Sequence, residues 1–247
     1  MAIELNFVAV VIVCLLISVI AYWKHVLSLS GVISAFFVGI ALGVFGGIAW
    51  LLLLLIFLIA SFGATKYKFE AKKRWGVQEG KKGERTWRNV VANGAVPVVL
   101  AILNYLGFAG VSHEHYSLLY LTALATAAAD TLASEIGVLS ERVYLVTTLK
   151  RVQRGTNGGV SLLGLTWAFI GSAFVALSGI AFLHYTDKVS LSIFSIALIT
   201  LAGFIGCQID SLLGATLENH GLLTKGTNNL CSIALSVMLI EVILWVT

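Results

Sequence analysis

Uninterrupted apolar runs constrain this chain more than any other feature of its sequence. Several runs approach about 20 residues, the length with which an α-helix crosses the hydrocarbon core of a bilayer, about 30 Å thick. Hydrophobic residues make up 59% of the 247 residues and charged residues 11%, against about 45–50% and about 25% in soluble domains. Because the runs are continuous and do not alternate with polar residues, the sequence predicts an all-α polytopic membrane protein rather than a β-barrel.

The apolar runs divide into about eight predicted transmembrane helices within a single integral membrane domain, residues 1–247. We place them at Leu5–Trp23, Gly31–Gly47, Ile48–Ala64, Gly94–Val111, Tyr116–Gly137, Gly159–Phe182, Leu191–Leu217 and Asn228–Val246. The second and third spans are short for a bilayer and meet at Gly46-Gly47, so one broken hairpin is an alternative for this pair.

Basic residues lie almost entirely in the loops on one side of these spans. If the N-terminus is outside, every Lys and Arg except Lys188 falls in an inner loop. Residues 65–93 form one basic cytoplasmic loop, and residues 138–158 form a second that ends in a Gly-rich turn. The positive-inside rule therefore predicts both termini outside. We expect the chemistry on the cytoplasmic face, or on the equivalent inner side of an organelle membrane.

Three carboxylates fall in the inner parts of predicted spans and a fourth directly follows one of these spans; an ionised side chain within a span is costly, by about 2.5–3.5 kcal/mol on insertion scales. They are Asp130, Glu135, Asp210 and Glu218. Both spans that carry them run from outside to inside, so we expect these acids at similar depth. Asp130 and Glu135 have no cation in their own span, so they are either protonated or hold a cation supplied from elsewhere. A plain hydrogen bond between helices is the alternative for each single acid.

A short pattern occurs twice in the second half of the chain. Asp130-Thr131-Leu132 is followed by Gly155-Thr156-Asn157 in the next inner loop, and Asp210-Ser211-Leu212 is followed in the same way by Gly226-Thr227-Asn228. Because the two units share one orientation, they predict a parallel repeat of spans 5–6 and 7–8, with a site at their junction. The matches are short, so chance similarity is the alternative.

Two polar groups beside the spans suit an anion. The turn Gly155–Gly159 opens a predicted helix, and its backbone N–H groups could bind a phosphate, although a plain capped turn is the alternative. The basic side chains near it, which favour the anion, are Lys150, Arg151 and Arg154. Arg85, Asn89 and Asn93 are spaced four residues apart, a polar stripe that leads into the fourth span.

Carboxylates, guanidinium groups and a Gly-rich turn together suit phosphoryl transfer. Mg²⁺ binds one or two carboxylates together with phosphate oxygens, and guanidinium groups bind phosphates through two parallel hydrogen bonds. A lipid whose headgroup lies at the cytoplasmic face would be the substrate. The alternatives are a transporter or flippase of a phosphorylated lipid or ion, since repeats and intramembrane acids also suit alternating access, and a non-catalytic lipid-binding protein.

Three blocks of this sequence resemble the signature blocks of the transmembrane protein 19 family, which includes plant phytyl-phosphate kinase. They are Asp130-Thr131-Leu132-Ala133-Ser134-Glu135-Ile136-Gly137, Gly155-Thr156-Asn157-Gly158-Gly159-Val160-Ser161 and Asp210-Ser211-Leu212-Leu213-Gly214-Ala215. The resemblance implies transfer of a phosphoryl group from a nucleoside triphosphate, with CTP one candidate, to an isoprenyl monophosphate such as phytyl or geranylgeranyl phosphate. Leu132 departs from the pattern, because many members carry a larger aromatic residue there.

The resemblance also suggests which residues do what. The expected catalytic residues are Asp130, Glu135, Asp210 and Arg85, and the expected Mg²⁺ ligands are Asp130, Glu135 and Asp210. The expected substrate-binding residues are Asn89, Asn93, Ser134, Lys150, Arg151, Arg154, Gly155, Thr156, Asn157, Gly158, Gly159 and Ser211. We expect an isoprenyl phosphate lipid, a nucleoside triphosphate and membrane lipids as partners, and no nucleic acid.

Overall fold

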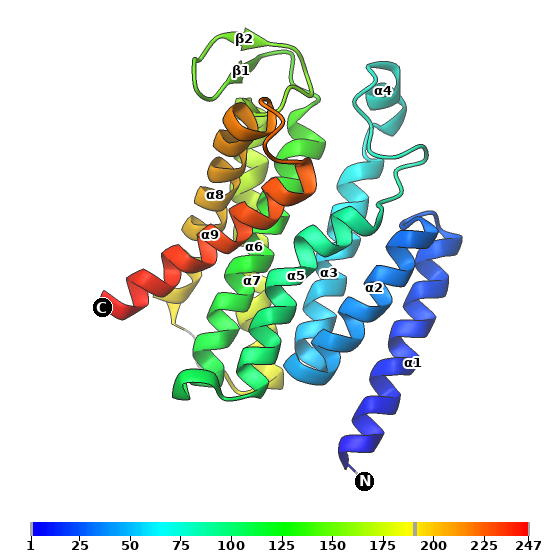
Figure 1. Cartoon of the computed structure of the whole chain (residues 1–247), viewed down its shortest axis with the longest axis vertical. Helices are drawn as coiled ribbons and strands as arrows, with labels where there is room; N and C mark the ends of the chain where they lie inside the picture. The colour runs from blue at the N-terminus through cyan, green and yellow to red at the C-terminus, as the bar shows by residue number, and fades with distance from the viewer. Residues whose placement is uncertain (1, 190–191, 247) are drawn as a thin grey trace.

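Long helices make up most of the molecule (Figure 1). The computed structural model describes residues 2–189 and 192–246. The long helices are α1 (Ala2–Trp23), α2 (Leu29–Ala41), α3 (Ile48–Lys66), α5 (Trp87–Tyr105), α6 (His113–Gly137), α7 (Leu162–Thr186), α8 (Ile193–Leu213) and α9 (Lys225–Val246). The shorter elements are α4 (Phe69–Arg74), the π-helical segments η1 (Leu42–Gly46) and η3 (Gly214–Glu218), the 3-10 segment η2 (Phe108–Gly110), and the strands β1 (Val143–Leu145), β2 (Arg151–Val152) and β3 (Gly159–Val160).

The predicted all-α membrane class is confirmed. Within the described residues, five helical segments are long and apolar enough to cross a membrane. They are Leu29–Gly46, Ile48–Lys66, Leu162–Thr186, Ile193–Glu218 and Lys225–Val246. Helix α1 adds a shorter apolar stretch, Phe7–Trp23. Because α5 and α6 carry more polar residues than these segments, the count of eight spans stays a prediction.

Helix α5 is displaced from the predicted fourth span, Gly94–Val111. It begins at Trp87 because Thr86 caps it: the Thr86 backbone N–H donates to Asn89 Oδ1 at 3.1 Å, in a capping box. It ends at Tyr105, since Gly107 takes a left-handed conformation with φ of +58°. The sequence-based boundaries were therefore late at both ends, because the polar first turn was assigned to the loop.

The second and third predicted spans form a helical hairpin. Helix α2 continues into η1, and the chain then reverses direction into α3 (Figure 1). Gly47, at the reversal, has φ of +89°, a conformation that favours glycine. The predicted seventh span begins at Leu191, a residue outside the described part of the chain, and α8 begins at Ile193 with Ser192 as its cap.

Helix α6 lies at the centre of the bundle and packs against α3, α5, α7, α8 and α9. Every residue from Tyr116 to Ala129 is buried, and many are small, which lets neighbouring backbones approach closely. At Gly203 of α8, an added Cβ would lie 2.3 Å from Ser172 Oγ and 2.8 Å from Ala125 Cβ. This tight contact holds α6, α7 and α8 together, and it brings the two acid-bearing helices, α6 and α8, side by side.

One end of the bundle carries a small sheet and α4, at the top of Figure 1. The sheet has strand order β2-β1-β3 and is antiparallel, with Val143 opposite Val152 and Tyr144 opposite Val160. The sequence predicted only a basic loop there, because strands of two or three residues leave no readable alternation. Both basic loops therefore lie at one end, as the predicted orientation requires, and the orientation itself stays a prediction.

Candidate functional site

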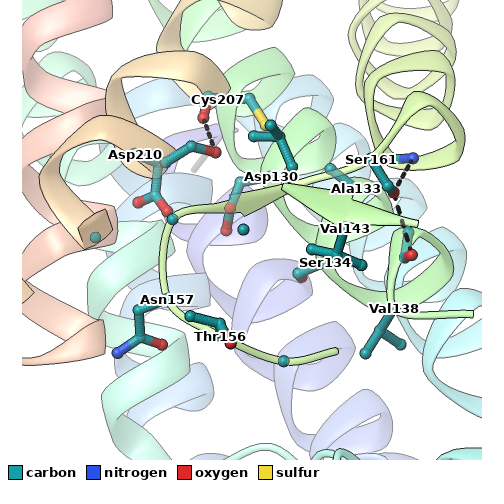
Figure 2. Close-up of a pocket in the computed structure, with 18 of the residues that line it drawn as sticks. Asp130, Ala133, Ser134, Val138, Val143, Thr156, Asn157, Ser161, Cys207 and Asp210 are labelled. Atoms are coloured by element: carbon teal, nitrogen blue, oxygen red, sulfur yellow. Dashed lines mark hydrogen bonds between the residues drawn. The ribbon is translucent and has the colours of Figure 1, made fainter. Parts of the chain in front are cut away.

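A cavity of about 320 Å³ lies beside the sheet, among the ends of α6, α7, α8 and α9. Figure 2 shows the side chains of Asp130 and Asp210 pointing into it, with Thr156 and Asn157 on the turn opposite them. Asp130 comes from α6 and Asp210 from α8, the two helices that the glycine contact holds together. The predicted convergence of these two acids is what the structure shows.

Each of the two carboxylates has one neutral donor from α9. Asp130 Oδ2 accepts from Asn229 Nδ2 at 2.9 Å, and Asp210 Oδ1 accepts from Ser232 Oγ at 3.1 Å. The two carboxyl groups are close enough to interact electrostatically with one another. Among the described residues, neither has a Lys or Arg within ion-pair distance. Two carboxylates at such close range need a shared proton or a bound cation between them.

Neutral oxygens add to the metal-binding capacity of this cavity. Asn228 donates from Nδ2 to the Asp210 carbonyl at 3.0 Å and to Glu218 Oε2 at 3.2 Å, while its buried Oδ1 has no hydrogen-bond partner. Gln78 Oε1, also on the cavity wall, is buried and without a partner too. An acceptor left without a donor inside a protein is suited to a cation or a bound water.

The side chains fit Mg²⁺ that is held jointly with a substrate. In the described part of the chain, no group of three or more His, Cys, Asp or Glu side chains could hold a metal ion. Mg²⁺ usually takes only one or two carboxylates and completes its shell with water and phosphate oxygens. Asp130 and Asp210 match that requirement, and hard oxygen donors suit Mg²⁺ better than a softer metal.

The Gly-rich turn forms the opposite wall. Gly155 and Gly158 have φ of +78° and +73°, which favours glycine. An added Cβ at Gly158 would lie 2.4 Å from Ala215 Cβ, so the turn can approach the end of α8 only with glycine there. Asn219 Nδ2 holds the turn further by donating to the Asn157 carbonyl at 3.3 Å. The turn is therefore fixed against the helix that carries Asp210.

The sequence predicted that the turn leads directly into a helix, and this prediction was wrong. The turn leads into β3, and α7 begins only at Leu162, where Ser161 Oγ accepts from the Gly164 N–H at 3.1 Å. The other Gly-Thr-Asn segment, residues 226–228, lies in the first turn of α9. The two segments thus differ in conformation, although Asn157 and Asn228 line the same cavity. The parallel repeat stays a prediction.

Ser134 and Ser211 also line the cavity, as expected of substrate-binding residues. Each hydroxyl donates to a carbonyl of its own helix: Ser134 Oγ to Thr131 at 3.1 Å, and Ser211 Oγ to Cys207 at 3.2 Å. Their oxygens keep acceptor capacity, so each could still receive a hydrogen bond from water or a ligand.

Glu135 does not join Asp130 and Asp210, which corrects its predicted place among the Mg²⁺ ligands. It is buried against Lys72 of α4, whose Nζ lies 2.6 Å from Glu135 Oε2. Thr65 Oγ1 donates to Glu135 Oε1 at 3.0 Å. The physical reason is the helix period: five residues beyond Asp130 is about 140° around the axis, so Glu135 faces α3 and α4.

The three basic residues near the turn, Lys150, Arg151 and Arg154, do not line the cavity. Lys150 and Arg151 are exposed on the sheet, and Arg151 Nη2 donates to the Glu141 carbonyl at 3.2 Å. The Arg154 guanidinium stacks on the Trp75 ring, 4.0 Å from its centroid, and lies 3.6 Å from Glu141 Oε1. The β1–β2 hairpin thus leaves Lys150 and Arg151 exposed and Trp75 holds Arg154, which corrects the predicted contact of these three side chains with substrate phosphate.

Sequence reasoning missed five residues of this site, Gln78, Glu79, Lys225, Asn229 and Ser232. Lys225 and Glu79 line the cavity and form an ion pair at 3.3 Å, and Asn229 donates to Asp130. A signal was available for two of them, because Lys225 and Asn229 directly flank the Gly-Thr-Asn segment at 226–228. Gln78 and Glu79 had none, since they lie in a polar loop that is far in sequence from Asp130, Asp210 and the Gly155–Gly159 turn.

Arg85, Asn89 and Asn93 lie together, as the stripe predicted, but they line a second cavity. Asn89 and Asn93 are on α5, and Arg85 precedes it. Burial lowers the pKa of the Arg85 guanidinium below its usual value, and the charges of nearby carboxylates, Glu135 first, oppose this shift. An arginine stays protonated under these conditions, so Arg85 is a buried cation.

Comparison with known proteins shows the family. A family model described as "Integral membrane protein DUF92" matches residues 12–234. The chain belongs to the DUF92 family. An uncharacterized membrane protein of Methanocaldococcus jannaschii is 34% identical over 227 residues, 91% of this chain and 88% of that protein. No solved structure matches the chain.

Two plant proteins are also similar to this DUF92 chain. Protein PGR of Arabidopsis thaliana is 32% identical over 234 residues, 88% of this chain and 81% of that protein. "Protein VTE6, chloroplastic", also of Arabidopsis thaliana, is 32% identical over 195 residues, 78% of this chain and 57% of that protein. These relatives confirm the family that the three signature blocks indicated, and the structure brings all three blocks of this DUF92 chain to one cavity.

Proposed function

We propose that this protein is a membrane-embedded kinase that transfers a phosphoryl group from a nucleoside triphosphate to an isoprenyl monophosphate. The observation that carries the proposal is the meeting of Asp130 and Asp210 in one cavity, opposite a glycine turn. The resemblance of the signature blocks to a family that includes plant phytyl-phosphate kinase supports the acceptor class. The unpartnered oxygens of Asn228 and Gln78 support a metal-phosphate complex there.

The proposed reaction needs little acid–base chemistry from the protein. An oxygen of the acceptor monophosphate, already an anion, attacks the γ-phosphorus of the donor and forms the new P–O bond. The bond from the γ-phosphorus to the β-phosphate oxygen breaks, and the nucleoside diphosphate leaves with that electron pair. The barrier is then mostly the repulsion between the two phosphates and the entropy of aligning them, so positioning and cations matter most.

Each wall of the cavity has a task in this proposal. Asp130 and Asp210 would hold Mg²⁺, which when bound neutralises charge on the phosphate oxygens. Asn229 and Ser232 orient these two carboxylates. The turn at Gly155–Gly159 would bind donor phosphates through its backbone N–H groups. Mg²⁺, the donor and the acceptor are all parts of the proposal.

An assay in detergent tests the proposal. Purified protein is incubated with phytyl or geranylgeranyl phosphate, Mg²⁺ and each of CTP, ATP, GTP and UTP, and the isoprenyl diphosphate is quantified. We expect product with at least one donor, and a rate at least 100-fold lower in Asp130→Asn and in Asp210→Asn. Glu70→Gln is the matched control, since Glu70 is an exposed acid on α4 and should keep the wild-type rate.

The same assay separates the kinase from the transporter alternative. A kinase turns over in detergent, whereas vectorial transport requires a sealed membrane. If no donor and no isoprenyl phosphate gives a diphosphate, the kinase proposal is wrong. Uptake of an isoprenyl phosphate into proteoliposomes, lost in Asp130→Asn, would then support a transporter.

A further inference from the structure

A second cavity lies among α1, α2, α3 and the start of α5, helices that lie side by side in Figure 1. Most of its wall is apolar, from side chains of the first three helices, including Ala35, Leu54 and Phe57. Polar groups come mainly from the start of α5, where Arg85, Asn89 and Asn93 are situated. The cavity thus combines an apolar surface with one polar, cationic region, and this combination suits an amphiphilic ligand.

Among the described residues, two polar groups in this region lack a hydrogen-bond partner, and one of them, Asn93 Oδ1, is fully buried. Arg85 is 8% exposed, and its guanidinium makes no hydrogen bond or ion pair within residues 2–189 and 192–246. Asn93 is also 8% exposed, and its Oδ1 has no hydrogen-bond partner. A guanidinium without a hydrogen-bond partner in this region is unfavourable, because it loses much of its hydration and only the charges of nearby carboxylates, Glu135 first, compensate for that loss. An anion that carries a protonated oxygen or a bound water would satisfy both groups.

A single carboxylate connects this cavity to the Asp130–Asp210 cavity. Glu79 Oε1 accepts from Asn89 Nδ2 at 3.2 Å, on the side of the second cavity. Glu79 Oε2 lies 3.3 Å from Lys225 Nζ, on the side of the first. The two cavities are therefore separated at this point by one side chain, so a ligand headgroup at Arg85 would be a neighbour of the Asp130–Asp210 cavity.

We infer that the second cavity binds a single-chain lipid monophosphate, with the chain among α1, α2 and α3 and the phosphate at Arg85. The inference rests on the proposed function, since this ligand would be the kinase's acceptor. A guanidinium binds a phosphate through two parallel hydrogen bonds. The cavity is small, about 70 Å³ against about 320 Å³ for the first, which favours one chain over the two chains of a phospholipid.

Photolabelling tests this inference without any need for turnover. The full chain in detergent is irradiated with geranylgeranyl monophosphate that carries a diazirine at the chain end, and labelled peptides are mapped by mass spectrometry. We expect labels on α1, α2 or α3, and at least 10-fold less labelling in Arg85→Gln. Ala35→Phe should block the cavity, and Ser18→Phe, from α1, repeats the test if that variant does not fold. Ile33→Phe is the matched control on an exposed position of α2, and should label normally.

Competition identifies the ligand class. Unlabelled geranylgeranyl phosphate should displace the probe at a concentration at least 10-fold lower than geranylgeraniol, phosphatidic acid or inorganic phosphate. Equal competition by phosphatidic acid would mean a site for bilayer phospholipid and overturn the inference. Labels mapped outside the cavity, in a protein that shows kinase activity, would overturn it while leaving the proposed function intact. Labels inside the cavity of a protein without kinase activity would support it, and would refute the proposed function alone.

Discussion

Lys72 and Glu135 form a buried ion pair whose removal has a calculable effect. The side chains are 0% and 9% exposed, and Lys72 Nζ also donates to the Ala64 carbonyl at 3.0 Å. Lys72→Met keeps the length and apolar stem of the side chain but removes every one of these contacts. Glu135 would then keep only the Thr65 hydroxyl, at 3.0 Å, as a side-chain donor among the described residues.

The expected loss of stability follows from leaving a carboxylate buried without its cation. Removing one partner of a buried pair typically costs about 3–5 kcal/mol. For a chain of this size, each kcal/mol lowers Tm by about 2–4 °C, which gives a fall of about 6–20 °C. Replacing both partners by apolar residues is often neutral, so the double variant Lys72→Met/Glu135→Met should recover most of that loss.

Thermal unfolding in detergent, followed by intrinsic fluorescence, measures this effect. Lys73→Met is the matched control, because Lys73 is exposed on the same helix and its replacement should change Tm by less than about 2 °C. The reasoning fails if Lys72→Met unfolds at the temperature of this control, or if the double variant is less stable than Lys72→Met. Either result would mean that α4 does not depend on the ion pair for its attachment to α3 and α6.

Three further predictions concern the Asp130–Asp210 cavity. Gly158→Ala should lower kinase activity at least 10-fold, because a Cβ there meets Ala215, whereas Gly221→Ala, also at positive φ but with nothing within 4 Å, should not; rates of the two variants decide this. Lys225→Gln should raise the KM for the nucleotide at least 5-fold, while Arg154→Gln, stacked on Trp75 away from the cavity, should change it less than 2-fold. Removal of Mg²⁺ with EDTA should abolish turnover, and added Mg²⁺ should restore it, as measured by product formation.

The meeting of Asp130 and Asp210 could be predicted because it depends on features that a sequence displays. Asp130 and Asp210 lie in apolar helices that run in the same direction, which predicts a similar depth in the membrane for the two acids. The small residues around them predict close packing of the two helices. The Gly155–Gly159 turn was predicted from its glycines and from its place in the inner loop that follows the Asp130 helix. Their convergence required no knowledge of side-chain conformation.

The positions of basic side chains in the loops could not be predicted. Lys72 is one of several basic residues in the predicted loop of residues 65–93, and its partner Glu135 is 63 positions away. Lys150, Arg151 and Arg154 are close to the turn in sequence, yet Lys150 and Arg151 are exposed at the β1–β2 hairpin and Arg154 stacks on Trp75. In both cases the tertiary fold decides which partner a charge meets, and spacing along the chain does not identify that partner.

The carboxylate of Glu79 has a thermodynamic consequence for the two cavities. It bonds Asn89 on one side and Lys225 on the other, so any occupant that draws either partner away changes the energy of the remaining contact. Linkage is reciprocal: whatever factor one ligand applies to the affinity of the second, the second applies to the first. A donor and an acceptor bound on opposite sides of Glu79 would therefore change each other's affinity by the same factor. Glu79→Gln would reduce this coupling even if each ligand still bound alone.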